Sequence, residues 1–166
     1  MNLEILAAPL EPSAVEWRYQ SATKDGQKII VVPYVTNREI MRRLDEAFGI
    51  FGWKSSFKEV EGGFLCTLSA LDDKGVWVSK EDGAPRTDIE PIKGGVSNAM
   101  KRTAVQFGIG RNLYDFPKVF IESSDKFLPG WAMPLLDKMV EKINSGAVMR
   151  DVVVLKQADA QKLQQR

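Results

Sequence analysis

The sequence predicts an α+β fold in which an antiparallel sheet packs on helices. An Asp25-Gly26 turn joins two runs of alternating apolar residues, three short runs rich in aromatic and β-branched residues follow closely on one another, and two helical segments flank that group. The expected order is therefore a β-hairpin, a helix, a three-stranded β-meander and a second helix. At 166 residues, the chain is long enough for one domain with tails.

The chain is expected to begin with an irregular arm, residues 1–13, because Pro9 and Pro12 block a continuous helix. The hairpin follows, with the strands VEWRYQS and QKIIVVPYV and the connection ATKDG. Proline cannot donate a backbone hydrogen bond to a ladder, so Pro33 indicates a strand edge or a strand end.

The segment TNREIMRRLDEAFG carries a full set of helix signals. Thr36 and Glu39 have the spacing of a capping box, and Gly49 suits the position after the last turn. The apolar face consists of Ile40, Leu44, Ala47 and Phe48, and the other faces carry Arg38, Arg42 and Arg43.

The meander is expected from WKSSFKEV, FLCTLSAL and VWVSK, which the turn sequences EGG and DDKG separate. The polar run EDGAPRTDIE is then expected to form a loop. The second helix begins either at Pro91, as its first residue, or after Ser97, as its N-cap, and it ends before Gly108.

The C-terminal part is expected to add a short strand, KVFIE, and a third helix, PLLDKMVEKINSG, that stops at Gly146. The last residues, KQADAQKLQQR, are polar and helix-prone, and they are expected to be frayed or disordered. This organisation predicts an arm over 1–13, one domain over 14–121, and a C-terminal helix with a polar tail over 122–166.

Composition excludes several classes of function. The chain has no histidine, which removes the usual general base and the commonest zinc ligand, and nothing in the sequence predicts a cofactor. The single cysteine, Cys66, is expected to be a buried, reduced thiol. No apolar run is as long as a membrane span. A soluble cytoplasmic protein is therefore expected.

The formal net charge is only +1, so any site for a polyanion must come from local clustering. Such a cluster lies between Lys93 and Lys118, where the other cations are Lys101, Arg102 and Arg111 and the one anion is Asp115. The apolar stripe of the second helix predicts that Lys101 and Arg102 lie on its flanks or outer face. Tyr114 and Phe116 follow closely, and basic residues among aromatics are typical of sites for single-stranded nucleic acid.

Other functions compete with this interpretation. Gly108 and Gly110 could begin a dinucleotide fingerprint, but Leu113 stands at the third glycine position and the helix precedes the glycines instead of following them. A magnesium-dependent nuclease could use carboxylates expected in loops and turns, namely Asp72, Asp73, Glu81, Asp82, Asp88 and Glu90. A structural or adaptor oligomer would use Trp17, Trp53 and Trp77 for packing only, and tryptophans in alternating strands are usually buried.

Two long stretches resemble the single-strand annealing proteins of the Rad52 type, especially the short phage and bacterial members. They are GQKII…YVTNREIMRRLDEAFGIFGW and KGGVSNAMKRTAVQFGIGRNLY, and the resemblance covers residues 15–117. It combines an arginine that opens a helix ending in Phe-Gly, a three-strand meander, and a helix with Ser-x-Ala-x-Lys-Arg that leads into Phe-Gly-x-Gly-Arg-x-Leu-Tyr.

The resemblance implies a non-enzymatic, ATP-independent protein that assembles into rings or helical filaments and anneals complementary strands in recombination and repair. It implies that residues 14–121 are the annealing domain and that single-stranded DNA lies in a basic groove lined by Arg38, Lys101, Arg102 and Arg111. It also implies a single-strand-binding protein as a candidate partner, and a bacterial or phage-infected cell as the setting. The chain departs from the family at three positions: Val105 replaces an arginine and Ile50 a tyrosine of eukaryotic members, and Asn98 replaces an aspartate of many phage members.

Overall fold

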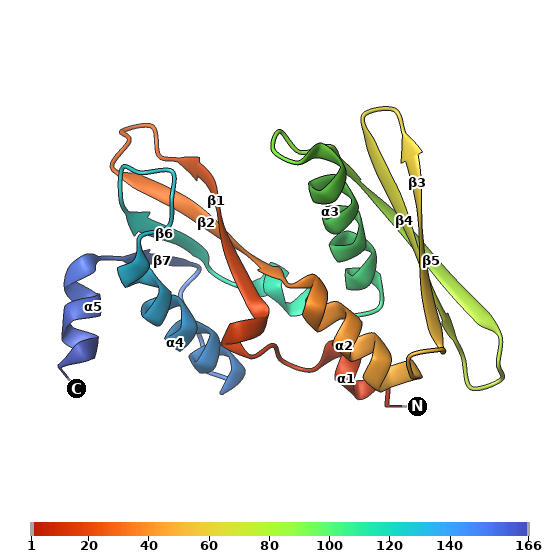
Figure 1. Ribbon diagram of the computed structural model, residues 1–166. Helices are drawn as coiled ribbons and strands as arrows, with labels where there is room; N and C mark the ends of the chain where they lie inside the picture. Colours follow the sequence, from red (N-terminus) through yellow and green to blue (C-terminus); the bar gives the residue numbers. More distant parts are fainter. Residues whose placement is uncertain (1, 166) are drawn as a thin grey trace. The chain divides into compact units, whose positions relative to one another are not determined.

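The computed structural model describes residues 2–165, and within it the chain divides into two units (Figure 1). The first unit contains the N-terminal segment up to Ala8 together with Val35–Arg111, and the second contains Pro9–Tyr34 together with the chain from Asn112 onward. The division falls at the end of strand β2 and at the start of the 3-10 helix η2.

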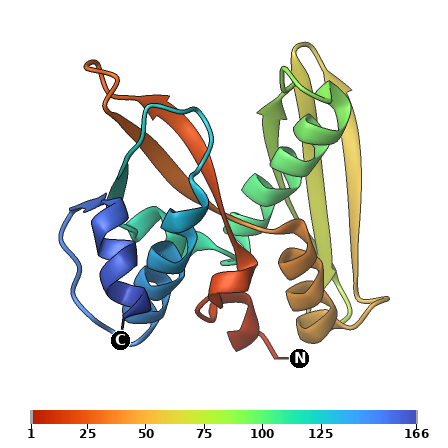
Figure 2. The same ribbon diagram turned by 60° about the vertical axis from the view of Figure 1, so that its left-hand side comes forward.

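The first unit is a three-stranded antiparallel sheet with helices (Figures 1 and 2). Its strands follow one another in the order β3-β4-β5, with Ser55 opposite Leu68 and Thr67 opposite Glu81. Helix α3 covers one face of this sheet and also contacts α2. Its elements are α1 (Glu4–Ala7), α2 (Asn37–Phe48), β3 (Trp53–Val60), β4 (Gly63–Leu71), β5 (Trp77–Pro85) and α3 (Pro91–Gln106).

The second unit is built on a four-stranded sheet of order β1-β2-β6-β7. Strand β2 pairs antiparallel with β6, and β6 pairs parallel with β7. Its elements are η1 (Pro12–Ala14), β1 (Val15–Ala22), β2 (Lys28–Val35), η2 (Arg111–Asp115), β6 (Lys118–Glu122), η3 (Gly130–Ala132), α4 (Met133–Asn144), β7 (Val152–Leu155) and α5 (Gln157–Gln164).

Each unit has its own apolar core. The sheet face under α3 is closed by fully buried residues from α2, β4, α3 and the turn after it, and the second unit buries residues from β2, β6 and α4. The largest of these apolar side chains in the first unit are Ile40, Leu44, Leu68 and Ile109, and in the second they are Leu10, Ile29, Val31, Val119, Ile121, Leu136 and Val140. Burial of such side chains is the main stabilising term in both units.

Helix α3 approaches its sheet closely because it has glycine where the two meet. A Cβ atom added at Gly95 would lie 2.6 Å from a ring carbon of Phe64 and 3.3 Å from the carbonyl oxygen of Pro85. No larger residue fits there without moving the aromatic ring. Gly95 therefore serves the packing of the helix on the sheet.

The predicted α+β class and the order hairpin, helix, meander, helix are confirmed. The second helix begins at Pro91, the first of its two predicted starts. Pairing of β2 with β6 ends at Val31, before Pro33. The domain boundaries predicted at 13/14 and 121/122 stay a prediction.

Three local predictions were wrong, and one strand was not predicted. Glu81–Pro85 is not a loop but the second half of β5, because it pairs with Gly63–Thr67 and its polar side chains find partners. The arm contains α1 and buries Leu6 and Leu10. Strand β7 was missed. The polar tail forms α5, which buries Ala160.

Candidate nucleic-acid interface

Arg102 is the most accessible cation of the predicted Lys-Arg pair. It lies on α3 with 55% of its side chain exposed, and its Nε and Nη2 atoms each lie 3.2 Å from Oδ1 of Asp82. Asp82 lies on β5, opposite the buried Cys66, on the face of the sheet that α3 covers. Arg102 thus presents a planar group of hydrogen-bond donors at the surface while it pairs with one carboxylate.

Lys101 is buried, with only 6% of the residue exposed, so its expected place on an open flank was wrong. The reason is the surroundings of α3, which packs on β4 and β5 on one side and contacts α2 as well. The following residues Thr103 and Ala104 are fully buried. A helical wheel of α3 alone cannot show how the other elements of this unit pack against the helix.

Arg111 binds the end of α3. Its Nε lies 3.1 Å from the carbonyl oxygen of Val105, and its Nη2 lies 2.9 Å and 3.0 Å from the carbonyl oxygens of Val105 and Gln106. The turn that brings it back uses Gly108 and Gly110, whose φ values of 97° and 71° favour glycine. Because the last carbonyls of a helix lack intrahelical donors and carry partial negative charge, Arg111 stabilises this end of α3.

Lys80 is a further cation at the same helix end, and sequence analysis missed it. Its Nζ atom donates to the carbonyl oxygen of Gln106 at 2.6 Å and lies 5.0 Å from the centre of the Phe107 ring. The position depends on the register of β5 against the rest of the sheet, so no sequence signal near Lys80 indicates it.

Arg38 lies in the first turn of α2 and is exposed. Both ribbon views place that turn beside the C-terminal end of α3, so the structure brings the segments of Arg38, Lys101, Arg102 and Arg111 to one end of the helix pair (Figures 1 and 2). Of these four residues, Lys101 is buried and Arg111 binds the end of α3. Arg38 and Arg102 are exposed, and neither binds a helix-end carbonyl among the hydrogen bonds of the described residues.

Arg43 was expected at the surface of α2 but is buried, with 1% of the residue exposed. Its Nη1 donates to the carbonyl oxygens of Ile5, Leu6 and Ala8 at 2.9, 3.2 and 2.6 Å, and its Nε lies 2.7 Å from Glu39. One guanidinium group thereby fastens the N-terminal segment to α2. It is a structural residue.

The predicted capping box is confirmed in its first half, since the Thr36 hydroxyl accepts from the Glu39 N–H at 3.2 Å. The Glu39 carboxylate accepts from Arg42 at 2.8 Å and from Arg43 at 2.7 Å. The hydrogen bond from Arg42 is the main reason that the pKa of Glu39 lies below its ordinary 4.5, and Arg43 adds to the effect.

The aromatic residues divide between the two units. Trp17 is buried in the second unit, with its ring centroid 6.4 Å from that of Phe116, and Trp53 donates to Asp45 at 2.7 Å in the first. Trp77 was expected to be buried but is 42% exposed, with Lys54 Nζ 4.2 Å from its ring centre. Tyr114 is 71% exposed.

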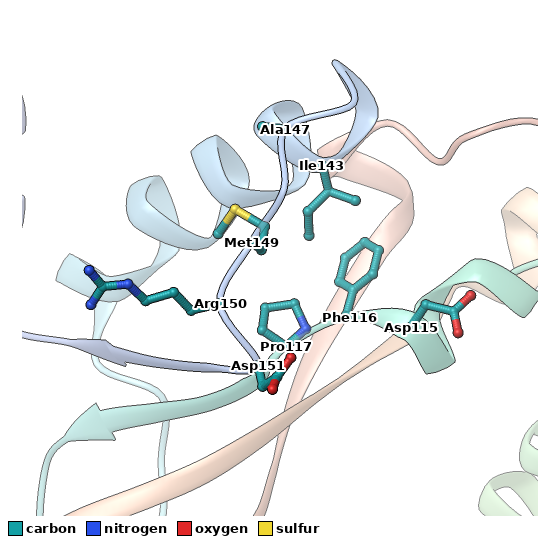
Figure 3. A pocket seen from close by; sticks show the side chains of 8 residues that line it. All are labelled: Asp115, Phe116, Pro117, Ile143, Ala147, Met149, Arg150 and Asp151. Atoms are coloured by element: carbon teal, nitrogen blue, oxygen red, sulfur yellow. The ribbon is translucent and has the colours of Figure 1, made fainter.

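The second unit also contains an open pocket of about 320 Å³ (Figure 3). Its walls combine apolar side chains with the charged residues Asp115, Arg150 and Asp151. The side chains of Arg150 and Asp115 point away from each other, to opposite sides of the view. No set of polar groups converges on a point among the labelled residues. The lining residues are Asp115, Phe116, Pro117, Ile143, Ala147, Met149, Arg150 and Asp151.

The acidic residues do not form a metal site in the described residues 2–165, where no group of three or more Asp, Glu, His or Cys side chains is placed to hold an ion. Glu81 accepts from the Thr67 hydroxyl at 2.6 Å, and Asp82 accepts from Arg102. Cys66 is buried as expected, and burial raises the pKa of its thiol. Over the same residues, no helix has the length and apolar character that crossing a bilayer requires.

Comparison with known proteins finds a matching family model and two named relatives. A family model described as Rad52/22 family double-strand break repair protein matches residues 3–76 and 70–132. Two relatives are both named single-stranded DNA-binding protein DdrA. The one from Deinococcus deserti is 37% identical over 140 residues, which cover 78% of this chain and 68% of the relative. The one from Deinococcus radiodurans is 33% identical over 138 residues, which cover 78% and 66%.

Proposed function

Because this chain belongs to the Rad52/22 family of double-strand break repair proteins, we propose that it binds single-stranded DNA and anneals complementary strands in recombination and repair. The relatives named as single-stranded DNA-binding proteins support the choice of ligand. The observation that carries the proposal is the exposed guanidinium of Arg102 on α3, inside the segment that the family model matches.

The DNA-binding residues in this proposal are Arg38, Lys101, Arg102 and Arg111. Arg38 and Arg102 contact backbone phosphates directly, because their side chains are exposed and a guanidinium matches a phosphate with two parallel hydrogen bonds. Arg111 has donors left over after binding the α3 carbonyls. Lys101 adds positive charge from beneath the surface.

Annealing requires the strand to be held by its backbone so that the bases remain free to pair. It needs no general acid, general base, cofactor or ATP, which is consistent with a chain that has no histidine. In this mechanism the protein is not an enzyme. Its contribution is to screen phosphate repulsion and to keep the strand extended.

We further propose that the working form is a homo-oligomer, either a ring or a helical filament. A subunit with three or four phosphate contacts binds weakly alone, since each contact gives a salt slope of about 0.7 on single strands. Linking many subunits converts weak contacts into avidity. The setting is the cytoplasm of a bacterial or phage-infected cell, where a single-strand-binding protein that covers the same DNA is a candidate partner.

The test compares Lys101→Ala/Arg102→Ala and Arg102→Ala with the wild type. Fluorescence anisotropy of a labelled oligothymidylate over a salt series should show binding by the wild type and at least about tenfold weaker binding by both variants, which corresponds to about 1.4 kcal/mol or more in an assembly. Light scattering should give an unchanged mass. Undiminished annealing by Arg102→Ala would contradict the site assignment.

A matched control is Lys93→Ala, at the start of the same helix. Lys93 is exposed and pairs with Glu90 at 3.0 Å, three residues before it, and it lies at the opposite end of α3 from Arg111. Its substitution removes the same charge from the same element and should change affinity less than about twofold.

Two further outcomes would overturn the function itself. Loss of labelled DNA with magnesium, prevented by a chelator, would indicate a nuclease. Absence of any affinity for single-stranded DNA at low salt would indicate a structural or adaptor oligomer, because that interpretation leaves no electrostatic binding to screen.

A further inference from the structure

We propose that Asp82 is an internal competitor of DNA phosphate for Arg102, so that it limits the affinity of the site and sets how readily a strand is released. This inference rests on the proposed function. In the unbound protein the carboxylate holds the guanidinium, and on binding the guanidinium passes to a backbone phosphate.

The geometry makes the carboxylate the fixed partner and the guanidinium the movable one. Asp82 lies within β5, where it pairs with Cys66 of β4. Its Oδ1 accepts a hydrogen bond from the Gly83 N–H at 2.7 Å. The same oxygen receives both nitrogens of Arg102 at 3.2 Å. Both distances are long for a charge-assisted bond, which is usually 2.7–2.9 Å. Asp82 is thus anchored by the sheet, while Arg102 is held loosely.

Exchange of the carboxylate for a phosphate costs little free energy. The Arg102 side chain is 55% exposed and that of Asp82 is 29% exposed, so water screens the pair. Carboxylate and phosphate oxygens offer a guanidinium the same forked acceptor geometry. A phosphate therefore takes the place of Asp82 without a change in the helix.

The other cations at this end of α3 differ from Arg102 in their partners. Lys80 and Arg111 donate to backbone carbonyls, which they would leave without a donor if they moved away. Arg102 instead leaves a carboxylate that water and a counterion can solvate. Asp82 is consequently the residue at which strand binding and release can be adjusted without weakening α3.

Salt dependence provides a second signature. When Arg102 leaves Asp82 for a phosphate, DNA releases a counterion, but the freed carboxylate recruits a cation from solution. The two effects partly cancel in the wild type. Without the carboxylate, the slope of log K against log salt should steepen by up to about 0.7 for each Arg102 contact.

The experiment measures affinity of the full chain for an oligothymidylate by anisotropy, across a salt series. Asp82→Asn keeps an oxygen that can accept from Gly83 and removes the charge. We expect it to bind about two- to fivefold more tightly than the wild type, with a steeper salt slope and a slower dissociation rate.

Glu81→Gln is the matched control. Glu81 is the preceding residue on β5, so its side chain points to the other face of the sheet, where it accepts from Thr67. It removes the same charge without touching Arg102, and it should leave affinity within about 1.5-fold of the wild type.

The double variant Asp82→Asn/Arg102→Ala completes a double-mutant cycle with the two single variants. If Asp82 acts through Arg102, the gain seen for Asp82→Asn should disappear when Arg102 is alanine. Asp82→Thr, a residue that suits a strand, is the second variant if the asparagine variant melts at a lower temperature than the wild type.

Three results would overturn the inference while leaving the proposed function intact: unchanged affinity in Asp82→Asn, an equal gain in Glu81→Gln, or a gain that persists in the Arg102→Ala background. A wild-type protein that does not bind the oligothymidylate would overturn the proposed function and this inference with it.

Discussion

The two units build their sheets in different ways. In the first unit, the consecutive strands β3, β4 and β5 pair through short turns. The second unit also pairs the consecutive strands β1 and β2, but it adds β6 beside β2 and β7 beside β6, from segments far apart in the chain. The candidate cations belong to the first unit, and Arg102, Arg111 and the nearby Lys80 donate hydrogen bonds to carbonyl or carboxylate oxygens. The unit built from neighbouring strands thus carries the candidate site, and we expect its stability to depend on polar contacts such as those of the buried Arg43.

The largest expected effect is at Arg43, the buried guanidinium of the first unit. Arg43→Met removes the donors to Ile5, Leu6 and Ala8, and it leaves one buried and two partly buried carbonyl oxygens without this donor. We expect a loss of about 3–5 kcal/mol in the free energy of unfolding, measured by urea denaturation. Hydrogen exchange should accelerate in the N-terminal segment.

Arg42→Met is the matched control for this prediction. It changes the neighbouring arginine, whose side chain is 52% exposed and pairs with Glu39 and Glu46. The cost should stay under about 1 kcal/mol. An equal loss from the two variants would show that burial of Arg43 does not decide the stability of this unit.

The next prediction tests whether the units unfold separately. Ile121→Ala in β6 and Leu68→Ala in β4 each empty a fully buried site in the middle of one sheet. Each should cost about 2–5 kcal/mol. Hydrogen exchange should accelerate in the second unit for Ile121→Ala and in the first unit for Leu68→Ala. Faster exchange in both units for either variant would show that the units do not unfold separately.

A smaller effect is expected at Gly95, where α3 approaches the sheet. Gly95→Ala places a methyl group 2.6 Å from the Phe64 ring, which must move. The expected cost is about 1–3 kcal/mol, measured by thermal unfolding. Gly130→Ala, where no atom lies within 4 Å of the new methyl group, should be neutral or slightly stabilising, and a similar cost at both positions would refute the packing explanation.

The same contrast explains how much of the fold could be predicted from the sequence. The boundaries of α2 follow from Thr36 and Gly49, and the meander follows from its glycine-containing turns, because these signals act between neighbours in the chain. Strand β7 has only four residues, and its partner β6 lies in a distant segment. No local pattern specifies such a parallel pairing.

The candidate site was predictable in its residue types but not in its contacts. Charge clustering identified Lys101, Arg102 and Arg111. Whether a helical cation is exposed depends on what packs beside the helix, which is why Lys101 and Arg43 are buried against expectation. The Asp82–Arg102 contact depends on the register of β5 under α3, and the polar composition around Asp82 favoured a loop over the strand that makes the contact.

The smallest effect concerns pH and Glu39, which joins Arg42 and Arg43 within the first unit. Hydrogen bonds from these arginines, that from Arg42 foremost, hold the pKa of Glu39 below its ordinary 4.5. A lowered folded-state pKa means that the ionised carboxylate stabilises the folded state above pH 4.5 and that this contribution is lost as pH falls through the folded-state pKa. Glu39→Gln should therefore cost about 1 kcal/mol in the free energy of unfolding at pH 7, and the difference from the wild type should shrink below pH 4.5 in urea titrations.

Glu46→Gln is the control. It removes only a 43% exposed partner of Arg42 and should cost less than about 0.5 kcal/mol. A pH-independent difference for Glu39→Gln would mean that the arginines act on this helix through packing and not through charge.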